Sequence, residues 1–233
     1  MSYTSVDQAI STKQYDANLA RVESSDYSIS SGDTGQDFEE VFPSQNESSS
    51  NLGGRTFTTD NGNFPWRNVT ILENGTPIYF ADVSQYTPKT PDMVWHSGNK
   101  SGPVIGHTFI HVGPQSIQCG IGPEETAMKW FELKRSGFAH NKSYEVERDG
   151  RRYVICRSNR GPKSGQYHVW DAQTKEVVAT HVSEFKFGSM RRQKTLTFKS
   201  GVDEELQLLL VMAMSAWREK SRRTRNAANR QPY

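Results

Sequence analysis

Two histidines stand where they could begin a metal site. His107 and His111 alternate with Phe109, so all three side chains would share one face of a strand. Imidazole nitrogens are common metal ligands, but a site needs further ligands close by. No acidic residue or cysteine lies near this pair, and the other histidines are scattered along the chain. We therefore interpret the two as ordinary strand residues, and we expect no metal and no cofactor.

Nucleophilic and nucleotide chemistry have no local signature in this chain. The Gly-x-Ser-x-Gly elbow, the phosphate-binding loop and the dinucleotide fingerprint are all absent. Histidine, cysteine and aspartate could be combined into a triad on paper, but any chain of this length permits that. The sequence therefore predicts a protein that is not an enzyme.

Clusters of lysine and arginine are the stronger lead. Residues 129–163 hold ten basic and four acidic residues, and residues 218–230 hold six basic and one. Such clusters attract acidic lipid head groups or nucleic acid, although solvated loops are often basic too. The aromatic residues lie mostly at inward positions rather than where bases could stack, so we expect anionic lipid and no nucleic acid. The candidate anion-binding residues are Arg151, Arg152, Arg191, Arg192 and Lys194.

A helix with almost no polar face ends the folded part of the chain. Between Leu206 and Trp217 only Gln207 and Ser215 are polar, whereas a surface helix carries a polar side. Its twelve residues reach roughly 18 Å, against about 30 Å for the hydrocarbon core of a membrane. The helix therefore needs a protein interior around it. The residues that we expect to form its buried core are Leu206, Leu209, Leu210, Met212 and Trp217.

The start of this helix has a local signal. Ser200 and Asp203 have the spacing of a capping box, which makes Ser200 the candidate N-cap. Acidic residues follow in the first turn, where they suit the helix dipole. The pattern predicts a helix over about 203–222.

Alternating apolar and polar residues predict strands from residue 64 onward. Asn74-Gly75 and Asp149-Gly150 mark two hairpins, and a third turns between Asp171 and Lys175. About twelve strand candidates follow one another by short turns, so neighbours should pair antiparallel. The last two candidates are EFKFG (184–188) and KTLTFKS (194–200).

Two architectures can bury the helix. A closed barrel with the helix on its axis covers every helical face and leaves no sheet edge. A two-sheet sandwich with the helix across one open end would leave one helical face in need of polar residues, which the sequence does not supply. The sequence therefore favours a mainly β protein with an antiparallel closed barrel around the helix.

Several stretches of the chain are similar to a known superfamily. They are DMVWHSGNKSGPVIGHTF (92–109), DGRRYVICRS (149–158), YHVWDAQTKEVVATH (167–181) and KTLTFKSGVDEELQLLLVMAMSAWREK (194–220). On these the chain resembles the tubby C-terminal-like superfamily, which includes tubby proteins, phospholipid scramblases and LURP-one-related proteins. It looks closest to a fungal group of unknown function. The resemblance covers roughly residues 64–223 and implies a twelve-stranded barrel around a central helix. Tubby binds a phosphoinositide through basic side chains on its barrel, but none of those residues can be aligned with this sequence.

The charge is unevenly distributed along the chain. Residues 1–54 are rich in serine and carry a net charge of −7, whereas residues 55–233 carry +9. We predict a disordered acidic leader over 1–54, a barrel domain over 55–223 and a disordered basic tail over 224–233.

These observations predict a binding module, and we expect a monomer. Its expected partner is anionic phospholipid or phosphoinositide at the cytoplasmic surface of a membrane. We expect Arg191, Arg192 and Lys194 to lie in a turn beside the start of the helix, at one rim of the barrel. One alternative is a scramblase-like protein whose helix enters the bilayer. Another is an adaptor that binds protein partners or acts in the nucleus through its basic tail.

Overall fold

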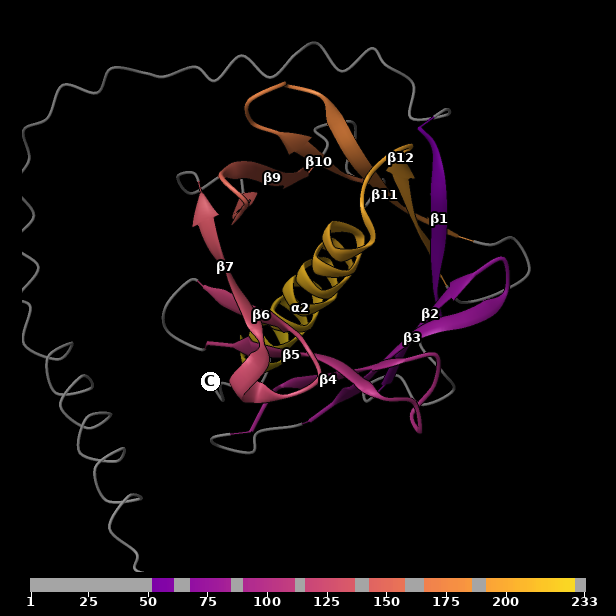
Figure 1. Ribbon diagram of the computed structural model, residues 1–233, viewed down its shortest axis with the longest axis vertical. Helices are drawn as coiled ribbons and strands as arrows, with labels where there is room; N and C mark the ends of the chain where they lie inside the picture. The colour runs from indigo at the N-terminus through magenta and orange to yellow at the C-terminus, as the bar shows by residue number, and fades with distance from the viewer. Residues whose placement is uncertain are drawn as a thin grey trace, which may run out of the picture. The chain divides into compact units, whose positions relative to one another are not determined.

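The protein is a closed antiparallel barrel around one helix. A computed structural model describes residues 52–60, 68–84, 90–111, 116–136, 143–157, 166–185 and 192–228. Twelve strands in this part of the chain surround the C-terminal helix α2 (Glu204–Ala228) (Figure 1). The closed barrel expected from the sequence is thus confirmed, and the sandwich is excluded. The strands are β1 (Gly53–Asp60), β2 (Asn68–Glu73), β3 (Thr76–Val83), β4 (Met93–Ser97), β5 (Val104–Ile110), β6 (Ile117–Ile121), β7 (Lys129–Ser136), β8 (Ser143–Arg148), β9 (Arg151–Arg157), β10 (Tyr167–Asp171), β11 (Val177–Phe185) and β12 (Arg192–Lys199), with a short 3-10 helix η1 (Glu125–Ala127) between β6 and β7.

Each strand pairs with the next one along the chain, and β1 closes the circle by pairing with β12. The predicted hairpin turns supply the local geometry. Asn74 and Gly75 have φ of 51° and 82°, and Asp149 and Gly150 have 51° and 73°. Positive φ at both central residues is what a type I′ turn requires, and this turn matches the twist of the strands.

One strand was not predicted from the sequence, and one predicted strand is wrong. The strand β1 begins at Gly53, inside the segment expected to be a leader, and EFKFG is not a separate strand because Glu184 and Phe185 end β11. In β1 only Phe57 is buried, and threonines occupy both faces, so the strand carries no apolar alternation. Its main partner β12 is more than a hundred residues away, and no short-range turn signal announces the pairing.

The position of β1 yields a test of the domain boundary. A chain that begins at residue 52 should keep its cooperative melt within about 3 °C of the full chain. A chain that begins at residue 61 lacks β1, which leaves β2 and β12 as unpaired edges, and it should show no cooperative melt. Thermal unfolding followed by circular dichroism distinguishes the two. Equal melts for both chains would mean that β1 does not close the barrel.

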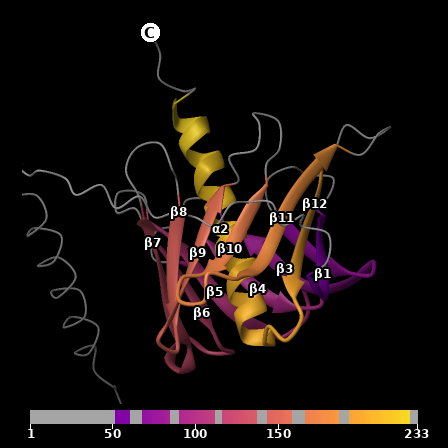
Figure 2. The same cartoon turned by 90° about the horizontal axis from the view of Figure 1, so that it is seen from above.

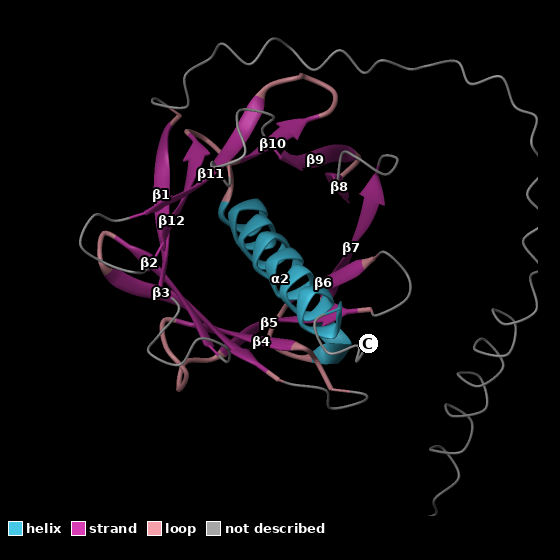
Figure 3. Cartoon of the chain, turned by 180° about the vertical axis from the view of Figure 1, so that it is seen from behind, coloured by secondary structure: helices cyan, strands magenta, loops and turns pink. Residues whose placement is uncertain are grey.

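The interior of the barrel encloses α2 on all sides (Figure 3). From Leu206 to Trp217 every residue except Ser215 is buried, and Leu209, Leu210 and Met212 have no exposed surface. The core residues predicted for this helix are therefore confirmed as buried. On the side of β5 and β6 the helix approaches closely because Gly106 has no side chain. A Cβ built on it would lie 2.9 Å from Met212 Cε.

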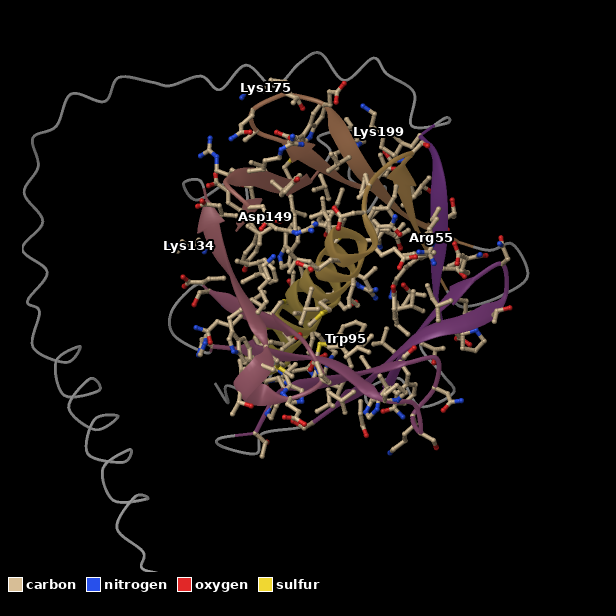
Figure 4. The ribbon with its side chains drawn as sticks, in the orientation of Figure 1. Arg55, Trp95, Lys134, Asp149, Lys175 and Lys199 are labelled. Carbon is tan, nitrogen blue, oxygen red and sulfur yellow. The ribbon has the colours of Figure 1, made fainter. Side chains whose placement is uncertain are left out.

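Large side chains fill the space on the other sides of the helix. Phe57, Trp95 and Phe198 are completely or almost completely buried, and Trp95 lies below the helix in Figure 4. The indole nitrogen of Trp95 donates a hydrogen bond of 3.1 Å to Thr108 Oγ1, so its polar atom is satisfied inside the core.

Both ends of the predicted helix need correction. The N-cap is Asp203 rather than Ser200, because the Leu206 amide donates to the Asp203 carboxylate at 3.0 Å. The helix also continues to Ala228, through part of the tail expected to be disordered. The added turns contain no glycine or proline, and Arg223 holds them to the barrel through Asp92 and the carbonyl of Ser84. Residues 1–51 and 229–233, the rest of the predicted leader and tail, lie outside the described residues.

Candidate functional site

The barrel has two chemically different ends. We call the end where α2 begins the proximal end, and the end where α2 leaves the barrel the distal end. In Figure 2 the last turns of α2 project beyond the strands at the distal end. The strands are joined at the proximal end by residues 74–75, 98–103, 122–128, 149–150 and 172–176, and residues 200–203 lead from there into α2.

At the proximal end, basic side chains are matched by carboxylates. Arg148 contacts both carboxylate oxygens of Asp203 at 2.7 Å, and its Nε lies 3.3 Å from Glu205. Lys129 Nζ lies 3.0 Å from Glu205 and 3.2 Å from Asp149. These two hydrogen bonds raise the pKa of Lys129. The network fixes the start of the helix and leaves little charge for a ligand.

Arg151 and Arg152, two of the five candidates, lie at this proximal end. Their side chains are 62% and 49% exposed. Arg152 is 3.4 Å from the carboxylate of Glu145, and Arg151 is 4.0 Å from that of Asp171. Acidic neighbours therefore offset their charge, which weakens them as a site for an anionic ligand.

Lys194 lies towards the other end of the barrel. It pairs with Thr59 and Ser183, near the start of β12. Because β12 spans about 26 Å, the start of the strand is far from the start of α2. The expectation that this cluster lies beside the start of the helix is therefore wrong, since the direction of β12 carries it to the distal end. The side chain of Arg192 and the whole of Arg191 lie outside the described residues.

An ion-pair cluster holds the distal part of α2. Glu219 accepts hydrogen bonds from Arg222 Nε at 2.7 Å and from Arg223 Nε at 2.8 Å. Arg223 also pairs with Asp92, at the start of β4. Burial acts to raise the pKa of Glu219, but the two arginines outweigh it and lower that pKa below its ordinary value. The carboxylates of Asp92 and Glu219 are therefore both engaged by arginines of α2.

This cluster predicts a pH dependence of stability. Because the folded pKa of Glu219 lies below the ordinary value of about 4.5, the ion pairs contribute fully above that pH and are lost as the pH falls through the folded pKa. Glu219→Gln should destabilise the protein by about 1–3 kcal/mol at neutral pH and by much less near about pH 3. Urea unfolding at several pH values measures the loss of stability at neutral pH and at low pH. A deficit that persists unchanged at low pH would show that the pairs do not carry the effect.

Arg218 is the distal residue that the sequence did not single out. It follows the buried Trp217, and the described residues offer it no hydrogen bond and no carboxylate within 4 Å. Its side chain keeps some contact with solvent, yet burial lowers the pKa of its guanidinium to about 10. The spacing of Arg218 could have indicated its partial burial. It stands four residues after Met214 and seven after Val211, so it lies on the same side of the helix as these two buried residues.

Other positive groups lie near the distal end of the barrel interior. Burial, followed by the charge of Arg135, lowers the pKa of Lys220. Lys220 Nζ lies 3.4 Å from the carbonyl oxygen of Ser116, just before β6. The described distal part of the barrel therefore combines Arg135, Lys194, Arg218 and Lys220 with the paired acids Asp92 and Glu219, and Asp60 and Glu184 also stand near the distal ends of β1 and β11.

The segments that join the strands also differ in charge between the two ends of the barrel. Between the distal strand ends, residues 61–67, 85–89, 112–115, 137–142, 158–165 and 186–191 lie outside the described residues. Together with the described residues beside them, these connections contain seven lysines and arginines and one acid, Asp92. The proximal connections contain two basic and five acidic residues. The charge difference therefore follows the barrel axis, which no sequence window reveals.

The predicted absence of a metal site stays a prediction. His107 lies on β5 and His111 follows the strand end, and within the described ranges no cluster of three or more histidine, cysteine or acidic residues could hold a metal ion. Both cysteines are free, Cys119 in the core and Cys156 partly exposed. None of the helices among these residues is long and apolar enough to cross a membrane.

Comparisons with family models, curated proteins and solved structures gave no match. The resemblance to the tubby C-terminal-like superfamily therefore stays a prediction that depends on the sequence stretches named above.

Proposed function

We propose that the protein is a non-enzymatic module that binds anionic phospholipid at the cytoplasmic surface of a membrane, with the distal end of the barrel facing the lipid. The observation that carries the proposal is the unequal charge of the two ends. Bases at the proximal end have carboxylate neighbours. The distal helical turns from Arg218 to Arg225 hold five bases and one acid, Glu219, whose carboxylate pairs with Arg222 and Arg223.

The energetics of membrane attachment support this choice. Each lysine or arginine near an anionic surface contributes about 1 kcal/mol. Three such residues contribute about 3 kcal/mol, which corresponds to roughly a hundredfold in affinity. The enclosure of α2 in the barrel favours attachment at the surface over the scramblase-like alternative, because removing the helix would expose its buried face.

Sedimentation of the full chain with vesicles tests the proposal. Binding to vesicles of phosphatidylcholine with phosphatidylserine should exceed binding to phosphatidylcholine alone, and added salt should weaken it because ions screen the attraction. Equal sedimentation with both vesicles, or none with either, would refute lipid binding and favour the adaptor alternative.

A further inference from the structure

Two arginines at the distal end of the barrel are largely removed from solvent. Arg222 and Arg223 belong to the distal turns of α2. Their side chains are only 19% and 11% exposed, although a basic helix end normally holds its charges in water. Arginine is seldom buried unless it is paired. The partners of these two side chains therefore decide whether an anionic ligand can reach them.

Arg223 is held by three acceptors. Its Nε donates to Glu219 at 2.8 Å, one terminal nitrogen donates to Asp92, and the other donates to the carbonyl oxygen of Ser84 at 3.1 Å. The Asp92 carboxylate is itself fixed, because its second oxygen accepts a hydrogen bond of 2.6 Å from the amide of Ile110, at the end of β5. These contacts join the end of β3, the start of β4 and the end of β5 to α2.

Arg222 is held by the same carboxylate of α2. Glu219 accepts hydrogen bonds from Arg222 Nε and from one of its terminal nitrogens, which is the two-bond geometry that guanidinium and carboxylate favour. The side chain of Glu219 is 10% exposed and that of Asp92 is 18% exposed. We call Asp92, Glu219, Arg222 and Arg223 the distal ion-pair cluster.

The carboxylates of this cluster occupy groups that a phosphate would use. Carboxylate and phosphate bind guanidinium in the same way, through parallel N–H···O hydrogen bonds. A guanidinium edge that binds a carboxylate is therefore closed to a phosphate. Exchange is unfavourable at a weakly charged surface, since breaking a buried ion pair costs more than one base gains near anionic lipid.

We propose that the distal ion-pair cluster is an autoinhibitory contact, in which Asp92 and Glu219 keep Arg222 and Arg223 from the anionic phosphate groups of a membrane. The inference rests on the proposed function and concerns the regulation of the same site. With the cluster closed, the distal end binds lipid through its other bases. When a carboxylate of the cluster is neutralised or displaced, Arg222 and Arg223 add to them and the affinity rises.

The first experiment neutralises one carboxylate in the full chain. Glu219→Gln opens the cluster, and the matched control is Asp60→Asn, because Asp60 is exposed at the distal end of β1 and lies outside the cluster. Both variants raise the net charge by one, which should increase the affinity for vesicles of phosphatidylcholine with phosphatidylserine about fivefold. Glu219→Gln should also release Arg222, for a total gain of about twenty-five-fold.

The second experiment measures the coupling between the carboxylate and the arginine. Arg222→Gln is introduced into the wild type and into Glu219→Gln, and vesicle affinity is measured for all four proteins. The loss caused by Arg222→Gln should be at least about three times larger in the Glu219→Gln background, because only there does the guanidinium contact lipid. Independent contributions would give the same loss in both backgrounds.

Asp92→Asn tests the contact from the side of the barrel. Its amide oxygen can still accept the hydrogen bond from Ile110, whereas Arg223 loses a charged partner. Its affinity should exceed that of Asp60→Asn by about threefold or more. All proteins are compared at a temperature where circular dichroism shows them folded, and Asp92→Asn decides the question if Glu219→Gln does not fold.

The results separate the contact from the proposed function. A gain for the cluster variants no larger than that for Asp60→Asn, or an equal loss from Arg222→Gln in both backgrounds, would refute the autoinhibitory contact and leave the membrane function standing. If the wild type and every variant bind anionic and neutral vesicles equally, or bind neither, the membrane function is refuted and the contact with it.

Discussion

Replacing Leu209 with aspartate is expected to leave the barrel unfolded. Leu209 has no exposed surface and lies in the middle of the enclosed helix. The substitution removes about 3 kcal/mol of apolar burial and places a carboxylate in the barrel interior, which costs several kcal/mol more. The sum is comparable to the whole stability of a typical domain, about 5–15 kcal/mol. Circular dichroism and solubility measure the result.

The matched control for this substitution lies on the same helix. Thr224→Asp introduces the same side chain at an exposed position near the end of α2, and it should change stability by less than about 1 kcal/mol. A soluble Leu209→Asp protein with an unchanged cooperative melt would mean that the barrel does not enclose α2.

Changing Arg191, Arg192 and Lys194 together to alanine should weaken binding to anionic vesicles by about a hundredfold. The estimate follows from about 1 kcal/mol for each base near a negative surface. The melting temperature should stay close to that of the wild type, because Lys194 is partly exposed and the ion pairs described above do not involve it. Vesicle sedimentation over a range of lipid concentrations gives the ratio.

The proximal end supplies a control with the same change in net charge. Arg151, Arg152 and Lys175 have exposed side chains at that end, and their joint replacement by alanine should reduce binding less than about threefold. Equal losses for the two triple variants would show that net charge, rather than the distal end, determines the affinity.

The barrel and its central helix could be predicted because their signals are local. An apolar run without a polar face demands enclosure, and the turns at Asn74-Gly75 and Asp149-Gly150 fix antiparallel neighbours. The strand β1 could not be predicted in the same way. Its pairing with β12 closes the barrel over a long sequence separation, and Phe57 is its only buried residue.

The candidate site was predictable only in part. The basic clusters are visible in the sequence, but their grouping depends on which end of the barrel each strand end occupies. This arrangement separates Arg151 and Arg152 from Lys194. Arg218 escaped notice because a base near a helix C-terminus usually serves the helix dipole. Its partial burial becomes evident only once the barrel surrounds Trp217.

The orientation of the barrel on a membrane is the most direct test of the proposed function. Single cysteines replace Ser101, exposed at the proximal end, or Thr224, exposed at the distal end, in a Cys156→Ser background that leaves only the buried Cys119. Each carries a fluorophore, and the vesicles contain anionic lipid with a quencher in the head-group region. The proposal predicts strong quenching at position 224 and little at position 101. Equal quenching at the two positions, or stronger quenching at position 101, would contradict it.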